Sequence, residues 1–418
     1  MSKAPPLRDD CFAMPRGVDW VSVNDALAKL KNSLHPIVET ETVKLDAALG
    51  RILAKDVFAK NSHPPFSNSA VDGYGFAHTA LPKGQEISLP LVAGRAAAGA
   101  AFEGKVPAGS AVRILTGARL PDGVDTVILE EDIAVSDGQV YFQNALKAQA
   151  NTRAKGEDID AGALTLPRST KLRADRLGVL AAIGVTEVSV YRPLRVAVLA
   201  TGDELVVNEA GADKINDANR PMLQGLLTQM GYAVVDIGIV PDDPAAVQRA
   251  LDKAAQLADV ILTTGGASAG EEDHISRMLT KQGNLQTWRV AIKPGRPIAM
   301  ALWKGKPVFG LPGNSIAAFV CTLVFAAPAF CALSGQGWKA PTGFKAPAAF
   351  SKSKKHGREE YLRARLNADG AVEVFGSEGS GRISGLSWSD GLVRLGHEAA
   401  EITKGDLVPF IPYVSWLE

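Results

Sequence analysis

The sequence predicts a multidomain protein in which a central parallel α/β domain is accompanied by an inserted all-β domain and a small C-terminal β domain. The length is one observation, because 418 residues correspond to about three domains at roughly 150 residues each. The second is the pattern between residues 194 and 333, where short apolar runs alternate with helical ones. Buried strands alternating with helices are typical of a parallel sheet covered on both faces.

Four regions are expected along the chain. They are a discontinuous N-terminal domain over 1–60 and 148–190, an inserted β domain over 61–147, the α/β domain over 191–336 and the C-terminal β domain over 337–418. In the first region, helical spacing predicts a helix over 21–34, a short helix beginning within 43–53, and a helix over 173–183 that is followed by the strand TEVSVY. Short alternating runs such as EISLPLVAG and QVYFQ predict the inserted β domain.

In the α/β region we expect the strands RVAVLAT, AVVDIGIV, DVILTTG, TWRVAI and PVFGL, with helices over 220–230, 244–257 and 274–279. The run 316–333 carries no charge and is nearly long enough to span a membrane. It is rich in alanine, contains Pro328 and directly follows a Gly-Asn turn, so we expect a buried core helix. After residue 337, runs such as REEYLRARL predict β structure again.

Composition excludes several classes of function. Lys plus Arg and Asp plus Glu both number 45, so no charge excess indicates a nucleic acid or a membrane surface as partner. Cys11, Cys321 and Cys331 form no C-x-x-C pair, and residues 1–17 contain no apolar stretch typical of a secretory signal. We therefore expect a cytoplasmic protein. The scattered histidines and the absence of G-x-S-x-G argue against a zinc site and a hydrolase triad.

The loops that follow the predicted strands carry the residues suited to ligand binding. The carboxyl ends of parallel strands meet at one edge of a sheet, where ligands bind. Glycines in these loops, as in 265–270 and 312–315, allow backbone N–H groups to approach an anion. Neither the P-loop nor the G-x-G-x-x-G pattern occurs, which disfavours a P-loop nucleoside triphosphatase and a standard dinucleotide-binding fold. The pattern predicts a phosphate-containing ligand.

Acidic residues in the same loops predict a cation as well, because they would otherwise repel phosphate. They are Glu204, Asp242, Asp243, Glu271, Glu272 and Asp273. Such oxygen ligands suit Mg²⁺. Alternatively, the aspartates cap the helices that they precede. Lys293 and Arg296 lie in a Pro-Gly-Pro frame that restricts the backbone, although surface ion pairs remain an alternative for both. In the inserted β domain, Asp72 could equally be a turn residue, and Thr116 could equally end a strand.

Nine motifs together resemble the molybdopterin molybdenumtransferases, the family that includes the E domain of gephyrin. The resemblance extends from about residue 21 to the end. The motifs are SAVDGYG (69–75), LTGARLP (115–121), KGEDI (155–159), TGDEL (201–205), NDANR (216–220), GIVPDDP (238–244), TTGGASAGEED (263–273), AIKPGRP (291–297) and GLPGNSIAA (310–318). The resemblance implies the last step of molybdenum cofactor synthesis, in which adenylylated molybdopterin and molybdate give the cofactor and AMP with Mg²⁺ required.

The resemblance also implies roles for single residues. Asp242 and Asp273 would bind Mg²⁺ or position phosphate, Glu204 would serve the metal or the attacking water, and Lys293 would bind an oxyanion. Asp72, Thr116 and Asp158 match positions that the family uses functionally. The inserted β domain would reach the sheet edge of a second subunit, so a homodimer is implied. The remaining positions implied to bind substrate are Gly265, Gly266, Ser268, Gly270, Arg296, Pro312, Gly313, Asn314 and Ser380.

The chain departs from the family pattern at Arg296, which replaces the second lysine of K-P-G-K-P, and in the loops GGASAG and GNSIAA. Arginine keeps the charge and changes the geometry of an oxyanion contact. Two other functions stay open. One is molybdopterin adenylyltransferase, whose stand-alone forms lack the extra β domains; the other is a non-catalytic scaffold of the gephyrin type. An upstream adenylyltransferase and acceptor molybdoenzymes would be partners of the transferase.

Overall fold

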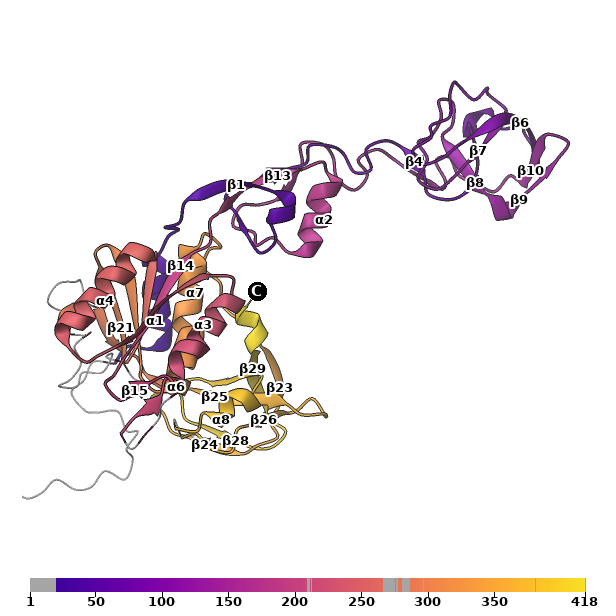
Figure 1. The fold of residues 1–418 in the computed structure, drawn as a ribbon. Coiled ribbons are helices and arrows are strands. Elements are labelled where there is room, and N and C mark those ends of the chain that lie inside the picture. The colour runs from indigo at the N-terminus through magenta and orange to yellow at the C-terminus, as the bar shows by residue number, and fades with distance from the viewer. Residues whose placement is uncertain are drawn as a thin grey trace, which may run out of the picture. The chain divides into compact units, whose positions relative to one another are not determined.

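The computed structural model describes residues 20–208, 211, 213–265, 275, 277–279, 286–295, 297–379 and 381–417 (Figure 1). The chain divides into two units. The first unit comprises Met1–Glu41 and Tyr191–Glu418, and the second comprises Thr42–Val190. The first nineteen residues, Cys11 among them, lie outside the described residues. The fold class predicted from the sequence, a multidomain mixture of α/β and β parts, is confirmed.

The second unit begins with a three-stranded sheet of order β1-β13-β2, formed by Thr40–Lys44, Glu187–Tyr191 and Ile52–Leu53. The helix α2 (Ala174–Ala182) packs its buried Leu180 in the same cluster as Leu53, so the predicted helix over 173–183 is confirmed. The predicted helix within 43–53 was wrong, because only the 3₁₀ turn Leu45–Ala47 forms there. Gly50, at a φ of +77°, turns the chain so that the next residues pair as β2.

Two short antiparallel pairs lead to the inserted β domain. They are β3 (Val57–Phe58) with β12 (Leu164–Leu166), and β4 (Asn68–Ser69) with β11 (Thr152–Arg153). A six-stranded sheet of order β8-β5-β7-β6-β10-β9 follows. Its strands are β5 (Gly73–Phe76), β6 (Glu86–Ala96), β7 (Ala111–Ile114), β8 (Thr126–Leu129), β9 (Ile133–Ser136) and β10 (Gln139–Gln143). The all-β character predicted for this stretch is confirmed.

The first unit is built on a six-stranded sheet of order β17-β14-β18-β22-β21-β19. Four strands run parallel: β17 (Ala233–Val240), β14 (Arg195–Thr201), β18 (Val260–Thr264) and β22 (Lys306–Leu311). The other two, β21 (Pro297–Trp303) and β19 (Gln286–Arg289), form an antiparallel edge. The strand β21 was not predicted; it begins at Pro297, and a proline is tolerated at the first residue of a strand.

Helices cover both faces of this sheet. The helices are α1 (Val23–Ser33), α3 (Asn219–Gln229), α4 (Pro244–Leu257), α6 (Ser315–Cys321) and α7 (Ala327–Leu333). Alternate residues of β14 enter different cores. Val196 and Val198 pack with α1, α3, α6 and α7, whereas Ala197 and Leu199 pack with α4. Alternation of this kind is what a strand buried on both faces produces.

The apolar run 316–333 is a core helix, as predicted. Within the described part of the chain, Ser315–Leu333 is the one helix long and apolar enough to cross a membrane, and 94% of its apolar window is buried inside the protein. A π-helical turn (Thr322–Ala326) lies between α6 and α7. The N–H of Ala327 donates to the carbonyl of Thr322, and this wider turn immediately precedes Pro328, which has no N–H to donate.

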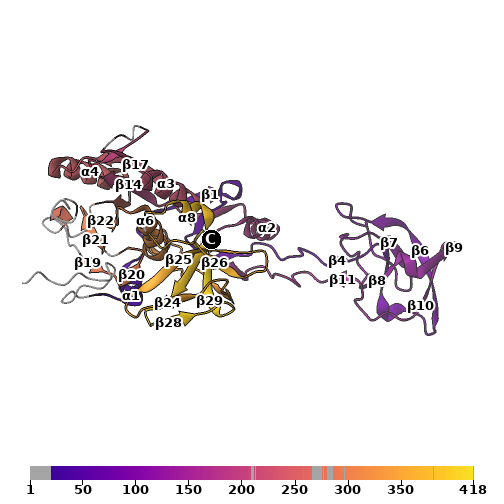
Figure 2. The same cartoon turned by 90° about the horizontal axis from the view of Figure 1, so that it is seen from below.

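The C-terminal region forms a second sheet of order β20-β25-β27-β29-β23, with β26 beside β25. Its strands are β20 (Ile292–Lys293), β23 (Phe344–Pro347), β25 (Glu359–Leu366), β26 (Val372–Val374), β27 (Gly391–Leu395) and β29 (Leu407–Pro412). A separate pair joins β24 (Lys352–Lys354) and β28 (Ala400–Ile402), and the helix α8 (Ser384–Trp388) follows β26. Figure 2 shows β20 beside β25, so a segment from the α/β region completes the C-terminal sheet.

Candidate functional site

The four parallel strands end at one edge of the sheet, here named the sheet edge: the loops that follow β14, β17, β18 and β22. Two of these loops hold each other through aspartates. The backbone N–H of Asp203 donates to Asp242 Oδ2 at 3.3 Å, and the N–H of Asp242 donates to Asp203 Oδ1 at 3.1 Å. Only one oxygen of each carboxylate is used in this exchange, which leaves the other oxygen able to contact a cation. Asp203 was missed by the sequence analysis, although it lies within the TGDEL motif.

Of the two adjacent aspartates Asp242 and Asp243, only Asp243 caps a helix. Asp243 is the N-cap of α4, and its carboxylate accepts the N–H of Ala246 at 2.7 Å. Asp242 is bound to Asp203 instead. Capping therefore explains Asp243 and leaves Asp242 as the candidate for ligand chemistry.

Glu204 is exposed at the sheet edge, and its backbone carbonyl accepts the N–H of Ile215 at 2.8 Å. Asp273, the third member of the predicted metal set, lies outside the described residues. Within the ranges that the structure describes, no three His, Cys, Asp or Glu side chains are grouped closely enough to hold a metal ion. The set of Glu204, Asp242 and Asp273 stays a prediction.

The glycine loops of the sheet edge are tightly packed from behind. Gly265 has a φ of +84°, and a Cβ added to it would lie 2.6 Å from the carbonyl oxygen of Thr201. The buried amide of Asn219 donates to Thr264 Oγ1 at 2.7 Å and to the carbonyl of Gly313 at 2.7 Å, which ties the loops after β18 and β22 together. Asn219 was not predicted as a site residue, although the NDANR motif contains it.

At the next loop, Asn314 is the N-cap of α6 and accepts the N–H groups of Ile316 and Ala317 at 3.1 and 3.2 Å. The carbonyl of Pro312, two residues earlier, accepts a long bond from Thr264 Oγ1 at 3.4 Å. The structure thus brings Gly265, Pro312, Gly313 and Asn314 to one place. The remaining predicted residues of the loops, Gly266, Ser268, Gly270, Arg296 and Ser380, lie outside the described residues.

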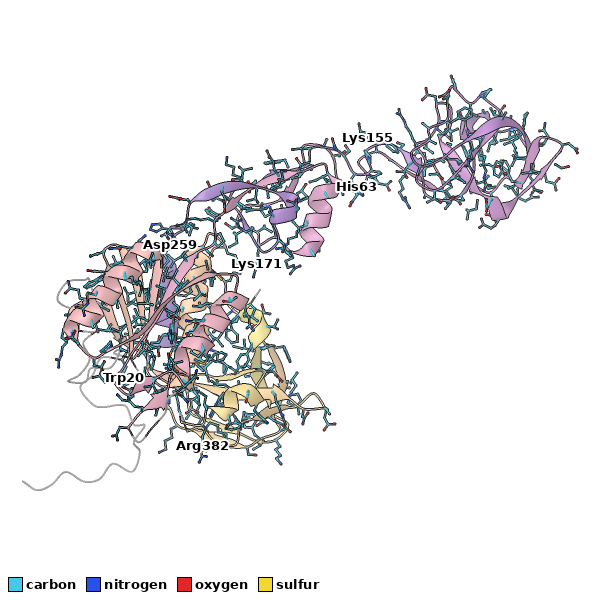
Figure 3. All side chains as sticks on the ribbon, viewed as in Figure 1. Trp20, His63, Lys155, Lys171, Asp259 and Arg382 are labelled. Atoms are coloured by element: carbon cyan, nitrogen blue, oxygen red, sulfur yellow. The ribbon has the colours of Figure 1, made fainter. Side chains whose placement is uncertain are left out.

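The opposite ends of the same strands show how an acid is neutralised away from the sheet edge. Asp259, labelled in Figure 3, precedes β18. It accepts hydrogen bonds from Arg192 at 2.7 and 2.9 Å and from the backbone and side chain of Arg195. Burial alone would raise the pKa of Asp259, but the hydrogen bonds from the two arginines lower it strongly. This carboxylate is fully committed to structure.

Lys293 lies elsewhere than expected. The sequence placed it after a strand of the parallel sheet, but it belongs to β20, where it pairs with Glu360 of the C-terminal sheet. It faces a cavity of about 180 Å³, here named the cationic cavity, whose polar lining includes Lys293, Lys352, Arg363, Ser377 and Glu378. The neighbouring Gly295 keeps this segment close to the sheet edge, because a Cβ added there would lie 3.8 Å from the ring of Pro312.

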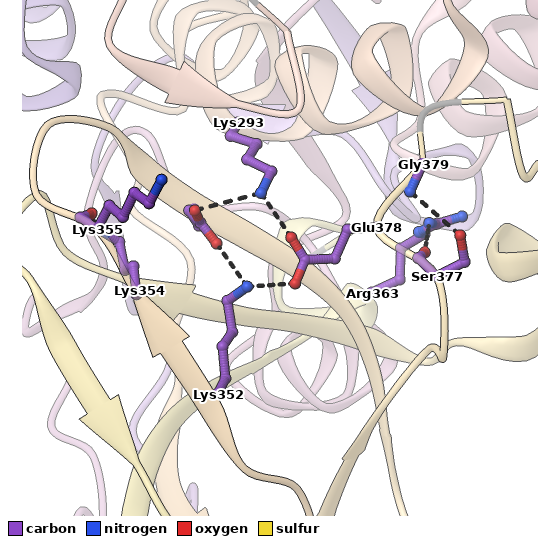
Figure 4. Close-up of polar contacts among 9 residues, drawn as sticks. Lys293, Lys352, Lys354, Lys355, Arg363, Ser377, Glu378 and Gly379 are labelled. Atoms are coloured by element: carbon purple, nitrogen blue, oxygen red, sulfur yellow. Dashed lines mark hydrogen bonds and ion pairs between the residues drawn. The ribbon is translucent and has the colours of Figure 1, made fainter. Parts of the chain in front are cut away.

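Two lysines and two carboxylates form a closed cluster in the cavity (Figure 4). Lys293 Nζ lies 2.6 Å from Glu378 Oε2 and 3.4 Å from Glu360 Oε1. Lys352 Nζ lies 3.2 Å from Glu360 Oε2 and also contacts Glu378. Burial tends to raise the pKa of Glu378, but hydrogen bonds from both lysines lower it. Burial likewise opposes the charge of Lys352, yet its contacts with the carboxylates raise its pKa.

Arg363 adds a further positive charge to this wall. Only 5% of it is exposed, and its guanidinium donates to the carbonyls of Ser377 at 2.6 Å and Arg382 at 2.5 Å. Its guanidinium carbon Cζ lies 4.8 Å from the centroid of the Phe375 ring. Burial lowers its pKa, and among the described residues no carboxylate forms an ion pair with it. A buried cation without a counter-charge favours an anionic ligand.

Sequence reasoning missed Lys352, Glu360, Arg363 and Glu378. For Glu360 and Arg363 the only signal was the density of charge in REEYLRARL, a strand in which most residues turn out to be buried. Charged residues in a buried strand need partners, but the sequence does not show which ones.

In the second unit, Asp72 and Thr116 contact each other. Asp72 Oδ1 accepts both the backbone N–H and the hydroxyl of Thr116 at 2.6 Å, and these bonds lower the pKa of Asp72. Asp158 is exposed in a turn, where its N–H donates to the carbonyl of His63 at 3.2 Å. The structure joins the first two residues and places Asp158 separately.

Family models match three stretches of the chain. The MoeA N-terminal region (domain I and II) matches 21–184, a probable molybdopterin binding domain matches 197–331, and the MoeA C-terminal region (domain IV) matches 345–413. Together these stretches include both the sheet edge and all the lining residues of the cationic cavity.

Whole proteins match as well. A molybdopterin molybdenumtransferase of Haemophilus influenzae is 36% identical over 94% of this chain and 98% of its own length. One of Nostoc is 34% identical over 85% of each. The crystal structure of a molybdopterin biosynthesis MoeA protein from Pyrococcus horikoshii has a TM-score of 0.83 at 28% identity, and the match covers 94% of this chain and all of that one.

Proposed function

The chain belongs to the molybdopterin molybdenumtransferase family, and from that premise we propose that it inserts molybdenum from molybdate into adenylylated molybdopterin and releases AMP. The observation that carries the proposal is the presence, in one unit, of an acidic sheet edge and a cationic cavity linked by the segment Lys293–Gly295. The reaction brings together a pyrophosphate-linked nucleotide and an oxyanion. The sheet edge is suited to the nucleotide with its cation, and the cationic cavity is suited to the oxyanion.

The sheet edge suits the phosphoanhydride and a divalent cation. Asp242 has a carboxylate oxygen that its bond to Asp203 does not use, and Glu204 is exposed on the neighbouring loop. These hard oxygen donors fit Mg²⁺, and we assign them to it together with Asp273; Glu204 alternatively holds the attacking water. Bound Mg²⁺ would neutralise charge on the phosphates. The backbone of the loops at Gly265 and Gly313 would approach those phosphates closely.

The cationic cavity suits molybdate. Lys293 was expected to bind an oxyanion, and Lys352 and Arg363 line the same cavity. Charge-assisted hydrogen bonds from ammonium and guanidinium groups are among the strongest available to a tetrahedral oxyanion. Lys293 would hold molybdate next to the sheet edge, because Ile316, at the start of α6, also lines this cavity.

We assign the inserted β domain a role at the sheet edge of a second copy of the chain. Asp72, Thr116 and Asp158 belong to the second unit, and in a homodimer they would complete the sheet edge of the partner subunit. The four predicted regions, with boundaries near 60, 148, 190 and 336, are retained as functional parts of this proposal. We also propose a cytoplasmic location, in keeping with the buried state of the one long apolar helix described.

The test is release of AMP from adenylylated molybdopterin by the purified protein. Release should require both molybdate and Mg²⁺, and no release under those conditions would refute the proposal. Formation of adenylylated molybdopterin from ATP and metal-free molybdopterin would instead indicate the adenylyltransferase. Unchanged AMP release in the double variant Asp242→Ala and Asp273→Ala would refute the metal assignment, and a scaffold would show neither reaction.

A further inference from the structure

Glu378 occupies the place in the cationic cavity where an anion would bind. Its carboxylate bridges Lys293 and Lys352, with Oε2 2.6 Å from Lys293 Nζ and the other oxygen in contact with Lys352 (Figure 4). A carboxylate held by two ammonium groups resembles a bound oxyanion in both charge and hydrogen bonding. The protein therefore supplies its own anion to this site.

The two carboxylates of the cluster differ in how firmly they are held. Glu360 lies on β25 between two neighbouring strands, and only 9% of the residue is exposed. Glu378 lies in the connection between β26 and α8, and 42% of its side chain is exposed. Glu360 is a fixed counter-charge, whereas Glu378 has solvent into which it can turn.

The backbone around Glu378 is fixed independently of its side chain. Arg363 donates to the carbonyl of Ser377 on one side and to that of Arg382 on the other. Both bonds use main-chain oxygens, so they persist when the Glu378 side chain changes rotamer. Departure of the carboxylate consequently needs rotation about side-chain bonds and no opening of the loop.

The charges agree with an exchange of one anion for another. While Glu378 is in place, Lys293 and Lys352 form ion pairs with Glu360 and Glu378. Arg363 also lines the cavity, so among the described residues three cations face these two carboxylates, and one positive charge is in surplus. When Glu378 turns out, Glu360 alone remains against the three cations. The surplus is then two positive charges, which equals the charge of a molybdate dianion.

We infer that Glu378 is a displaceable internal counter-ion, which occupies the oxyanion site until molybdate replaces it between Lys293 and Lys352. This inference rests on the proposed function, since it takes molybdate as the anion of the cavity. Glu378 is a specificity-determining residue in this arrangement, because a weakly bound anion does not displace it. No covalent bond changes in the exchange.

The experiment measures molybdate binding to the full-length protein by isothermal titration calorimetry, without pterin. Glu378→Gln keeps the size of the side chain and removes its charge, so molybdate should bind about tenfold more tightly than to the wild type, which corresponds to roughly 1.4 kcal/mol. The matched control is Glu373→Gln. Glu373 lies in the same sheet and pairs with Arg365 at 3.2 Å, outside the cavity lining. Its replacement should leave the affinity unchanged.

The outcomes separate the inference from the proposed function. If molybdate binds to the wild type and Glu378→Gln binds it equally or more weakly, Glu378 is a structural ion pair and the inference is overturned. If Glu373→Gln tightens binding as much as Glu378→Gln, the effect is general electrostatics and the inference is again overturned. If neither the wild type nor Glu378→Gln binds molybdate, the oxyanion assignment of the proposed function fails and the inference falls with it. Thermal melting of each variant verifies that it is folded.

Discussion

The sheet edge and the cationic cavity belong to the same unit but suit opposite partners. At the sheet edge, exposed carboxylates follow the parallel strands. At the opposite end of the sheet, Arg192 and Arg195 neutralise the carboxylate of Asp259. In the cavity, lysines and a buried arginine outnumber the one carboxylate that is fixed in place. The chain has no net charge, yet exposed acids lie on one side of the short segment around Gly295 and a cluster with a surplus of cations lies on the other. The difference teaches that a neutral protein can bind an anion and a cation at adjoining places.

The largest effect that would separate the two places is expected from Asp242→Asn. Loss of the charge at the sheet edge should lower the rate of AMP release by about a hundredfold or more, as for other losses of transition-state electrostatics. Molybdate affinity, measured by calorimetry, should stay unchanged because the cavity is intact. Asp243→Asn is the matched control, since asparagine caps a helix as well as aspartate does. Equal loss in both variants would show that the sheet edge is only structural.

A smaller effect is expected from Gly265→Ala. The added Cβ would lie 2.6 Å from the Thr201 carbonyl at a φ of +84°, so the free energy of unfolding in urea should fall by about 2 kcal/mol. Gly313→Ala is the control, because the nearest atom to its Cβ would be 3.7 Å away. Similar stability in the two variants would contradict the close packing behind the sheet edge.

A more local effect is expected from Lys293→Gln. Loss of one charge-assisted hydrogen bond should weaken molybdate binding by about tenfold while Mg²⁺ binding is unchanged. The control is Lys304→Gln, whose lysine is 58% exposed and pairs with Asp252 at 2.8 Å. A change in Mg²⁺ affinity with no change in molybdate affinity would reverse the assignment of the two places.

The smallest expected effect is on the pH dependence of stability. The lysines hold the pKa of Glu378 below its usual value, so its contribution is fully present above the unfolded pKa of about 4.3. It is lost as the pH falls through the lowered folded pKa. Wild type should therefore be slightly more stable than Glu378→Gln in urea at pH 7, and the two should converge in strong acid. A difference that grew in acid would contradict the lysine contacts.

Much of the fold could be predicted because its signals are local. Proline at the start and apolar spacing defined α4, and the absence of charge over 316–333 indicated a core helix. The strand β21 was missed because it begins at Pro297, a residue that disfavours strands but is tolerated at their first position. The 3₁₀ turn at Leu45–Ala47 was taken for a helix because its apolar spacing is the same over so short a stretch.

The candidate site was predicted only in part, for a similar reason. Asp242, Gly265 and Asn314 follow strands of the parallel sheet, so their meeting follows from the topology. Lys293 was assigned to the same sheet, but β20 pairs with a strand 67 residues later, and a two-residue strand carries no sequence signal of its partner. The pairing of Lys352 with Glu378 has the same origin, because it depends on tertiary contacts alone.

The most direct measurement is molybdenum anomalous diffraction from crystals soaked with molybdate and MgCl₂. If the sheet edge and the cationic cavity divide the ions as proposed, the anomalous peak lies between Lys293, Lys352 and Arg363, with Glu378 turned away from both lysines. Electron density for a hydrated cation should then appear beside Asp242. A molybdenum peak at Asp242 and none in the cavity would contradict the division of the two places.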